Sequence, residues 1–363
     1  MRTGILGGSF NPVHNQHIQM ALAAQKQFDL EEVWFIPVFQ PVHKPGDALL
    51  EYDARRDLLL AALKEHAGLR VCDIERDLGG ASYTVRTVSE LQQRYRGREF
   101  ILVIGGDSLV ELHSWREVTR LAGMVEFIVI ERPGCRRACQ VPEAILHWAE
   151  CEVSPVSASQ IRDKLGRHDF ADLHLPPEVL FKVLLGDYYG SLGEPYGSWL
   201  ETIAGQLRHL PEGMIAHIMA VAALAVNYGM EAGLDPRTCM LTGLSHDLFR
   251  IADSAELFAY AEGCGTQLSA LERKKPMLAH GAAAAGFLRK RIPAINPDIV
   301  NAVRWHTFPA DDAPLLTKVL VLADTLEPSR GIAERDNVRQ AEMSIEQRYQ
   351  RVLALKRKSA GGH

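Results

Sequence analysis

The sequence contains little of what marks a secreted, membrane-spanning or disordered protein. Its six cysteines form no Cys-x-x-Cys pair, so neither a disulfide framework nor a zinc knuckle is indicated. No uninterrupted apolar segment reaches ~18 residues, and the N-terminus lacks the basic stretch and apolar run of a signal peptide. Internal repeats and low-complexity tracts are also missing. We therefore expect a cytoplasmic protein with reduced thiols and no membrane partner.

The charge balance excludes a general attraction to polyanions. The formal net charge is −5 at pH 7, so nucleic acid is not an expected partner. Any phosphate must instead be held locally, by loops, helix starts and a few cations. The 363 residues, 47% of them hydrophobic, exceed the usual size of one hydrophobic core. Two domains are expected.

Residues 1–190 alternate between short β-rich runs and helical stretches. The runs are "GILGG", "VWFIPV", "LRVCDI", "EFILVIGG", "EFIVIERPG" and "CEVSPV", and helical segments such as "YDARRDLLLAALKEHA" separate them. Strands that alternate with helices predict an α/β, Rossmann-like domain with a parallel sheet covered on both faces. Ligands of such sheets gather at the C-terminal ends of the strands.

The character of the chain changes after a Gly-, Pro- and Ser-rich stretch that predicts a linker at 191–196. Residues 197–340 show apolar residues at three- and four-residue spacing, as in "EGMIAHIMAVAALAVNYG", "DPRTCMLTGLSHDLF" and "APLLTKVLVLADTLE". An all-α domain is predicted there. The basic stretch at the end of 341–363 is expected to be a solvated helix that frays into a tail.

The opening strand runs into a turn with the features of a phosphate cradle. Glycines let the backbone approach an anion closely, and the following helix start offers unpaired amide donors. His14 and His17 lie three residues apart, so both rings are expected on one face, where they can donate to phosphate oxygens. The residues of the turn itself are Gly7, Gly8, Ser9 and Phe10.

The stretch "GGSFNPVHNQH" resembles the GGSFNPxHxGH signature of bacterial nicotinate-mononucleotide adenylyltransferases. Later stretches resemble the same family in the same order. They are "PVFQPVHKP", "GASYTVRTV", "FILVIGGDSLVELHSW", "ERPG" and "VSASQIRDKL". The resemblance covers residues 1–190 and implies transfer of AMP from ATP to nicotinate mononucleotide, with Mg²⁺ accompanying ATP.

The resemblance also implies roles for individual residues. His14 and His17 would steady the triphosphate, while Ser157 and Arg162, at the start of a late helix, would hold its outer phosphates. Transfer of this kind depends on positioning and charge neutralisation, so no protein nucleophile is required. The phosphate of the mononucleotide would attack the α-phosphorus in line, and pyrophosphate would leave.

The acceptor side of this site is expected around Trp115, which would stack on the pyridine ring while neighbouring hydroxyl and amide groups bind its carboxylate. Asp107 is interpreted as a ligand of a ribose hydroxyl or a metal, or as a helix N-cap. Lys44 and Arg132 would contact phosphate or remain surface cations. The other residues assigned to binding are Ser82, Tyr83, Thr84, Gly106 and Ser159.

One position departs from the family pattern: Gln16 stands where the family has glycine. A long side chain there would crowd the nucleotide, or its amide would turn outward and be tolerated. We expect activity to be retained. Two alternatives stay open, in which the domain prefers nicotinamide mononucleotide or is a degenerate nucleotide sensor that regulates the second domain.

The second domain contains histidines and aspartates typical of a metal site. A carboxylate in an apolar run, such as Asp324 in "KVLVLADTLE", costs several kcal/mol unless it is paired or binds a metal. Imidazoles and carboxylates that converge from neighbouring helices suit iron, manganese or similar divalent ions. The candidate ligands of one or two such metals are His217, His246, Asp247, His280, His306 and Asp324.

This arrangement resembles the HD phosphohydrolase superfamily, which is named for its His-Asp pair. The stretches "GLSHDLFR", "WHT" and "LADTLEPSR" resemble, more narrowly, bacterial HD-domain hydrolases that cut diadenosine tetraphosphate into two ADP. The resemblance covers residues 197–335 and implies that metal-activated water is the nucleophile and that Arg250 stabilises phosphate charge. Glu327 and Arg330 would orient the nucleotide or simply cap and pair at the helix end.

Other HD subfamilies fit less well. Alarmone hydrolases carry two acidic residues shortly after the pair, whereas "HDLFR" has none, and the GYP-type signature of cyclic dinucleotide phosphodiesterases is missing. The sequence therefore predicts a bifunctional enzyme whose partners are ATP, nicotinate mononucleotide and diadenosine tetraphosphate. It leaves the oligomeric state open, a homo-oligomer included.

Overall fold

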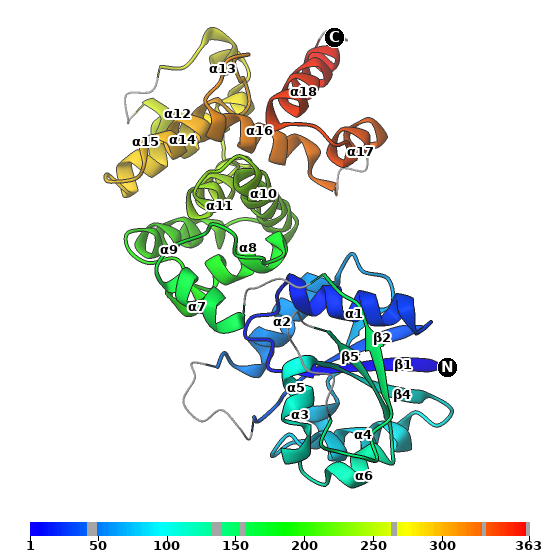
Figure 1. The fold of residues 1–363 in the computed structure, drawn as a ribbon. Coiled ribbons are helices and arrows are strands. Elements are labelled where there is room, and N and C mark those ends of the chain that lie inside the picture. Colours follow the sequence, from blue (N-terminus) through cyan, green and yellow to red (C-terminus); the bar gives the residue numbers. More distant parts are fainter. Residues whose placement is uncertain (42–48, 132–138, 153–156, 263–266, 329–331, 361–363) are drawn as a thin grey trace. The chain divides into compact units, whose positions relative to one another are not determined.

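The computed structural model describes residues 1–41, 49–131, 139–152, 157–262, 267–328 and 332–360. The chain forms two compact units, Met1–Val183 and Leu184–His363. The division falls inside helix α8 (Pro177–Leu185), a little before the predicted linker at 191–196. Figure 1 shows the α/β character of the first unit and the helical character of the second.

The first unit contains a six-stranded sheet with the order β3-β2-β1-β4-β5-β6. All neighbouring strands are parallel, as the sequence predicts. Strand β2 is buried along its whole length, which fits a strand covered on both faces. The strands are β1 (Arg2–Gly8), β2 (Glu32–Pro37), β3 (Leu69–Val71), β4 (Glu99–Gly105), β5 (Glu126–Ile130) and β6 (Leu146–Ala149).

Helices cover both faces of this sheet, with α1 and α2 on one face and α4 and α6 on the other (Figure 1). The crossovers from β1 to β2, β2 to β3, β3 to β4 and β4 to β5 each contain at least one helix, as is usual between parallel strands. The helices before the division are α1 (Asn15–Gln27), α2 (Tyr52–Leu63), α3 (Ile74–Leu78), α4 (Thr84–Arg94), α5 (Gly106–Val110), α6 (Val118–Ala122) and α7 (Ala158–Gly166).

The prediction for the sixth strand is wrong. The sequence predicts it at "CEVSPV", residues 151–156, but the strand is β6, "LHWA". Cys151 and Glu152 are not in a strand, and 153–156 lie outside the described residues. A short strand at the sheet edge needs no long run of β-branched residues, so its sequence gives a weak signal.

The strand order predicts that a ligand binds at the carboxyl ends of β1 and β4. The chain moves from β1 to β2 on one side, and β4 pairs with the other side of β1. In open α/β sheets, ligands bind at the carboxyl ends of the strands where the order reverses. Both of these strands end in glycine, with Gly7 and Gly8 closing β1 and Gly105 closing β4.

The second unit is helical throughout its described residues, which confirms the predicted all-α domain. Two of its helices begin with the caps that the sequence suggests, because Asp235 and Asn296 each precede a proline and accept a hydrogen bond from a first-turn N–H. The helices are α9 (Tyr196–Leu207), α10 (Glu212–Glu231), α11 (Pro236–Ser245), α12 (Ser254–Glu262), α13 (Ala270–Lys274), α14 (His280–Arg291), α15 (Pro297–Trp305), α16 (Leu315–Leu326), α17 (Ala333–Gln340) and α18 (Ile345–Ala360).

Helix α10 lies against α11 and α16 and carries His217. Among the described residues, it is the one helix whose length and hydropathy would also allow a membrane span. Helix α14 packs between α12 and α15, and α16 packs against α10, α15 and α18. This framework brings the ends of α11, α14 and α15 together with one face of α10 and α16.

The expectation of a solvated C-terminal helix is wrong. Helix α18 packs on α16 and buries Tyr349, Val352 and Leu353, while most of its charged residues remain exposed or half-buried. These three residues follow the spacing of one helix face. The basic composition of the stretch conceals that apolar face.

Candidate functional sites

The loop after β1 is held in a conformation that few residues adopt. Phe10 has φ +46°, a left-handed value that is costly for a bulky side chain. Its ring is 1% exposed and packs on Phe35 and on the edge of His17, with centroid distances of 5.5 and 5.0 Å. A Cβ on Gly8 would lie 3.2 Å from this ring, whereas a Cβ on Gly7 would meet nothing within 4 Å. Open space therefore lies over Gly7, where the family signature implies phosphate.

The two predicted histidines lie together at the start of α1. His14 is the residue before the helix, and its ring stacks on that of His17 with centroids 3.8 Å apart. The Nδ1 atom of His17 accepts a hydrogen bond from the His14 backbone N–H at 3.3 Å. This contact places the proton of a neutral His17 ring on Nε2, which can donate to a phosphate oxygen.

Two arginines hold this loop through hydrogen bonds to its backbone carbonyl oxygens. Arg55, on α2, is 1% exposed and donates hydrogen bonds of 2.8 Å to the carbonyl oxygens of Ser9, Val38 and Leu50. Arg162, on α7, donates to the carbonyl oxygen of Asn11 at 2.9 Å. The family resemblance implies a phosphate contact for Arg162. Arg55 was not predicted, because its only sequence signal is a charged residue within the apolar pattern of α2.

Ser157 forms the N-cap of α7. Its Oγ accepts a hydrogen bond from the Gln160 backbone N–H at 3.3 Å and lies 2.9 Å from the Oγ of Ser159. Both serines are exposed. The start of α7 therefore presents two hydroxyl groups and a helix N-terminus, and the same helix carries Arg162. These are groups that can bind the outer phosphates of a nucleotide.

The predicted acceptor residues lie at the ends of β4 and α4. The Oγ of Ser82 accepts hydrogen bonds from the Phe39 and Gln40 N–H groups at 3.0 and 3.1 Å, so this serine fixes the loop after β2. Tyr83 precedes α4, and the Arg116 guanidinium lies 4.5 Å from its ring centroid. Thr84 begins α4.

The segment after β4 begins with Gly106, which is buried and is the first residue of α5. Asp107 is exposed in the first turn of the same helix. Trp115 is half-buried against the core of the sheet. Lys44 and Arg132 lie outside the described residues.

Gln16 takes neither of the orientations expected from the sequence. Its side chain is turned into the protein, where the residue is 2% exposed and the amide Nε2 lies 3.7 Å from the Sγ of Cys151. Burial raises the pKa of this thiol, and the Gln16 amide partly opposes that rise. The departure from glycine therefore leaves the open surface over Gly7 unobstructed.

Close helix contacts assemble the histidine cluster of the second unit. A Cβ on Gly243 of α11 would lie 2.5 Å from the Cα of Ala222 on α10. A Cβ on Gly281 of α14 would lie 2.8 Å from the carbonyl oxygen of Val303 on α15. Glycine alone permits these approaches, which bring the ends of the helices close enough for their imidazoles to meet.

Three histidines have the same hydrogen-bond arrangement. The Nδ1 atoms of His246, His280 and His306 each lie 2.7–2.8 Å from the carbonyl oxygen of the residue three positions earlier. An Nδ1–H that donates to a backbone carbonyl fixes the tautomer and leaves a lone pair on Nε2. The three rings are therefore oriented as metal ligands usually are.

Asp247 lies among these Nε2 atoms. Its Oδ1 is 3.0 Å from the Nε2 of His280 and 3.8 Å from that of His306, and its Oδ2 is 3.6 Å from the Nε2 of His246. Within the described residues, Asp247 Oδ1 and His246 Nε2 are buried without a hydrogen-bond partner, and the nearest contact of Asp247 Oδ1 is the 3.0 Å approach of His280 Nε2. Buried polar atoms of this kind require a partner, and a cation would satisfy both.

The electrostatics of the cluster suit a cation. Burial alone would raise the pKa of Asp247. The nearby His246, His280 and His306 lower it by more, so the net pKa lies below the ordinary value and the carboxylate stays ionised. Burial and the neighbouring imidazoles lower the pKa of His306 to about 3. Its ring is therefore neutral at physiological pH, which is the form that binds a metal.

The remaining predicted ligands complete the cluster from α10 and α16. The Oδ1 of Asp324 lies 3.5 Å from the Nε2 of His217 and 3.9 Å from the Nε2 of His246. The Nδ1 of His217 lies 3.4 Å from the Oε2 of Glu327, which is 4% exposed. Glu327 therefore orients His217, which the sequence analysis did not foresee.

Two groups of donor atoms could each hold an ion. One consists of His217, His246 and Asp247 and the other of Asp247, His280 and His306, with the ligand atoms of each group within 4.8 Å of one another. Asp247 belongs to both. A mixed nitrogen and oxygen donor set with a shared carboxylate fits one or two divalent transition metals.

Two further side chains border the cluster. The NH1 atom of Arg250 lies 3.3 Å from the Nδ1 of His280. The Oγ1 of Thr307 lies 3.3 and 3.4 Å from the Nε2 atoms of His280 and His306. The stretch "WHT" contains this threonine, but its residue type alone predicts no role for it. Arg330 lies outside the described residues.

Comparison with known families agrees with the two units. The Cytidylyltransferase-like family matches residues 5–164, and the HD domain family matches residues 214–329. The first range contains the Gly7–Gly8 turn, His14 and His17. The second contains the whole histidine cluster.

Individual relatives each match about half of the chain. A probable nicotinate-nucleotide adenylyltransferase of Shouchella clausii is 39% identical over 193 residues, which cover 53% of this chain and 99% of the relative. One from Opitutus terrae is 34% identical over 182 residues, 50% of this chain and 93% of the relative. A Clostridium acetobutylicum crystal structure described as a predicted HD superfamily hydrolase involved in NAD metabolism covers 44% of this chain and 83% of its own, at 22% identity and a TM-score of 0.40.

Proposed function

Because the chain belongs to the nicotinate-nucleotide adenylyltransferase family through its first half and carries an HD domain in its second, we propose a bifunctional nucleotide enzyme. The first site would adenylylate nicotinate mononucleotide, and the second would hydrolyse diadenosine tetraphosphate. ATP and these two nucleotides are its small-molecule partners in this proposal, and the cytoplasm is the proposed location.

The observation that carries the first activity is the alignment of the Shouchella clausii relative, nearly all of which matches this chain. The mononucleotide phosphate attacks the α-phosphorus of ATP, the bond to the bridging oxygen breaks, and pyrophosphate leaves. His17 donates from Nε2 to the triphosphate, the loop at Gly7 offers backbone amides, and Arg162 and the start of α7 receive the outer phosphates. Mg²⁺ that arrives with ATP neutralises part of the phosphate charge.

Nicotinate mononucleotide is the proposed acceptor. The segment from Ser82 to Thr84 offers hydroxyl and amide donors that suit a carboxylate, and Trp115 offers a ring for stacking. Pyrophosphate release, measured with ATP, Mg²⁺ and either the acid or the amide mononucleotide, tests this choice. An equal or greater rate with the amide would reject the acid as the preferred acceptor.

A matched pair of histidine variants tests the site itself. His17→Ala should lower kcat/KM by about two orders of magnitude because it removes a donor to the triphosphate. His147→Ala should leave the rate unchanged, because His147 lies on edge strand β6 and pairs with Glu126 at 2.6 Å. Equal effects of the two substitutions would contradict the proposed role of His17.

The second activity rests on the buried donor set around Asp247. The residues that would hold one or two divalent ions, iron or manganese by their donor chemistry, are His217, His246, Asp247, His280, His306 and Asp324. A divalent ion there would supply Lewis acidity toward phosphate and a means of activating water at neutral pH. Arg250, at the border of the cluster, adds a positive charge that stabilises the phosphate as its charge increases.

Diadenosine tetraphosphate is proposed as the substrate because "GLSHDLFR", "WHT" and "LADTLEPSR" resemble the symmetrical hydrolases and the chain lacks the acidic pair of the alarmone hydrolases. Water adds to one of the two central phosphorus atoms, the bond to the central bridging oxygen breaks, and two ADP result. Chelation followed by restoration with single metals, with products identified by mass, tests this assignment. ATP and AMP as products would reject symmetrical cleavage, and activity that survives complete removal of metal would reject the ligand set.

A further inference from the structure

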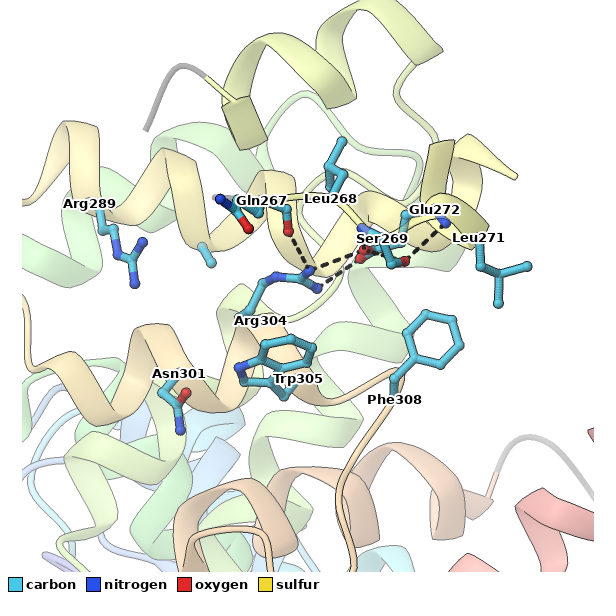
Figure 2. Close-up of a pocket in the computed structure, with 11 residues that line it drawn as sticks. Gln267, Leu268, Ser269, Leu271, Glu272, Arg289, Asn301, Arg304, Trp305 and Phe308 are labelled. Carbon is cyan, nitrogen blue, oxygen red and sulfur yellow. Dashed lines mark hydrogen bonds and ion pairs between the residues drawn. The ribbon is translucent and has the colours of Figure 1, made fainter. Parts of the chain in front are cut away.

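A pocket of about 680 Å³ lies between α14 and α15, beside residues 267–272 (Figure 2). Its volume is in the range of roughly 300–1,000 Å³ that small-molecule sites occupy. The residues that line it are Gln267, Leu268, Ser269, Leu271, Glu272, Ala285, Arg289, Asn301, Arg304, Trp305 and Phe308.

This pocket is distinct from the histidine cluster. None of the residues that line it belongs to the candidate metal ligands. Arg289 follows His280 by nine residues on α14, so at about 100° per residue the two side chains leave the helix on opposite sides. A ligand in the pocket would therefore occupy a second site of the helical unit.

Exposed aromatic side chains border the pocket. Trp305 is 45% and Phe308 40% exposed, and Leu271 beside them is 46% exposed. The Arg304 guanidinium lies 4.2 Å from the Trp305 ring centroid and holds the indole in place. Large rings that stay accessible beside a pocket of this volume are typical of a surface on which a planar ligand stacks.

The charge of the pocket is positive. Arg304 donates to both carboxylate oxygens of Glu272, at 2.8 and 3.1 Å, so these two buried charges cancel. Arg289 is exposed and adds a positive charge to the lining of a chain whose net charge is −5. Figure 2 shows Arg289 and Asn301 at one end of the pocket and Phe308 and Leu271 at the other. The two ends thus suit an anion and an aromatic ring.

We propose that this pocket binds a nucleoside phosphate, with the base against Phe308 and Trp305 and the phosphate at Arg289. The amides of Asn301 and Gln267 provide donors and acceptors for the polar edges of such a ligand. The ion pair of Arg304 with Glu272 forms a rigid floor. The proposal goes beyond the hydrolytic centre and does not depend on hydrolysis, because it uses none of the candidate metal ligands.

Fluorine NMR of the full chain, labelled with 5-fluorotryptophan, tests binding at this pocket directly. The Trp305 resonance is assigned by its loss in Trp305→Phe, and Trp34, Trp148 and Trp199, which lie outside both proposed nucleotide sites, serve as internal references. Addition of ADP should shift the Trp305 resonance saturably, both in the parent chain and in Asp247→Asn, in which the hydrolytic centre is impaired. No shift with ADP, or a shift that disappears in Asp247→Asn, would overturn the proposal.

Variants and simpler probes separate the two halves of the ligand. Arg289→Glu should weaken ADP binding at Trp305 by at least about tenfold, since it removes a charge-assisted contact. The matched control Lys290→Glu changes the same charge at the next position, which is not part of the pocket, and should have little effect. Equal weakening by both variants, or equally tight binding of inorganic phosphate or of adenosine alone, would overturn the nucleoside phosphate assignment.

Discussion

Replacing Gln16 by glycine tests whether the unusual residue in the first site interferes with the nucleotide. The side chain is buried, and its amide approaches Cys151, so it does not reach the surface over Gly7. We therefore expect pyrophosphate release by Gln16→Gly to stay within about twofold of the parent chain, because the contacts that neutralise charge are unchanged.

The same substitution should reduce stability. Glycine in the first turns of α1 costs up to about 1 kcal/mol relative to a residue with a side chain. Loss of the buried contacts adds about 1–2 kcal/mol. The sum of about 1–3 kcal/mol corresponds to a fall in the melting temperature of roughly 2–12 °C for a unit of this size. Differential scanning calorimetry measures this fall.

Gln16→Ala is the matched control, because it removes the same amide but keeps a good helix former. It should show the smaller loss of stability and the same activity. Alkylation of Cys151, followed by mass spectrometry, should be faster in both variants, because the side chain that covers the thiol is gone. A gain of tenfold or more in kcat for Gln16→Gly would refute the reasoning, since it would mean that the glutamine lies against the substrate.

Three further predictions concern buried charges. In a urea titration, Arg55→Met should lower the free energy of unfolding of the first unit by about 3 kcal/mol or more, because three carbonyl oxygens lose their donor. The control Arg56→Met removes a half-buried ion pair and should lower this free energy by less than about 1 kcal/mol. Arg304→Met should lower the free energy of unfolding of the helical unit by about 3–5 kcal/mol, since it leaves Glu272 buried without its partner. A decrease no larger than that caused by Arg273→Met, at an exposed arginine, would contradict the stabilising role of the buried ion pair. Burial raises the pKa of Glu272, but Arg304 and the cap at the start of α13 lower it by more, so the net pKa lies below the ordinary glutamate value. The ionised Glu272 therefore stabilises the fold fully above the ordinary glutamate pKa, and this stabilisation is lost as the pH falls through the lowered pKa. The melting temperature of the helical unit should fall over that acidic range by less in Arg304→Met than in the parent chain.

The sequence predicted the fold class because strand and helix periodicities differ clearly along the chain. The cradle was found because Gly7, Gly8, His14 and His17 are close together in the sequence. Arg55 was missed because its partners are three backbone carbonyls in the connections after β1 and β2, and the residue types there do not reveal a contact made by backbone atoms. The buried direction of Gln16 was missed because it depends on Cys151, which lies 135 residues later in the chain, just after edge strand β6.

The cluster of the second unit was predicted from residue types, since imidazoles and carboxylates in apolar helices need a reason to be there. The contact between Glu327 and His217 could not be derived, because it depends on how α10 and α16 pack. The pocket around Arg304 and Trp305 gave no signal, because its lining comes from three separate segments. The burial of α18 was hidden by the charged residues that surround its apolar face, such as Arg348, Arg351 and Arg357.

The most direct test of two independent active centres is product analysis by mass spectrometry on the intact chain, His17→Ala and Asp247→Asn, each incubated with both sets of substrates. We expect the intact chain to form nicotinate adenine dinucleotide from ATP and two ADP from diadenosine tetraphosphate. His17→Ala should lose only the first product, and Asp247→Asn only the second. Loss of both products in either variant, or no dinucleotide from the intact chain, would contradict the account.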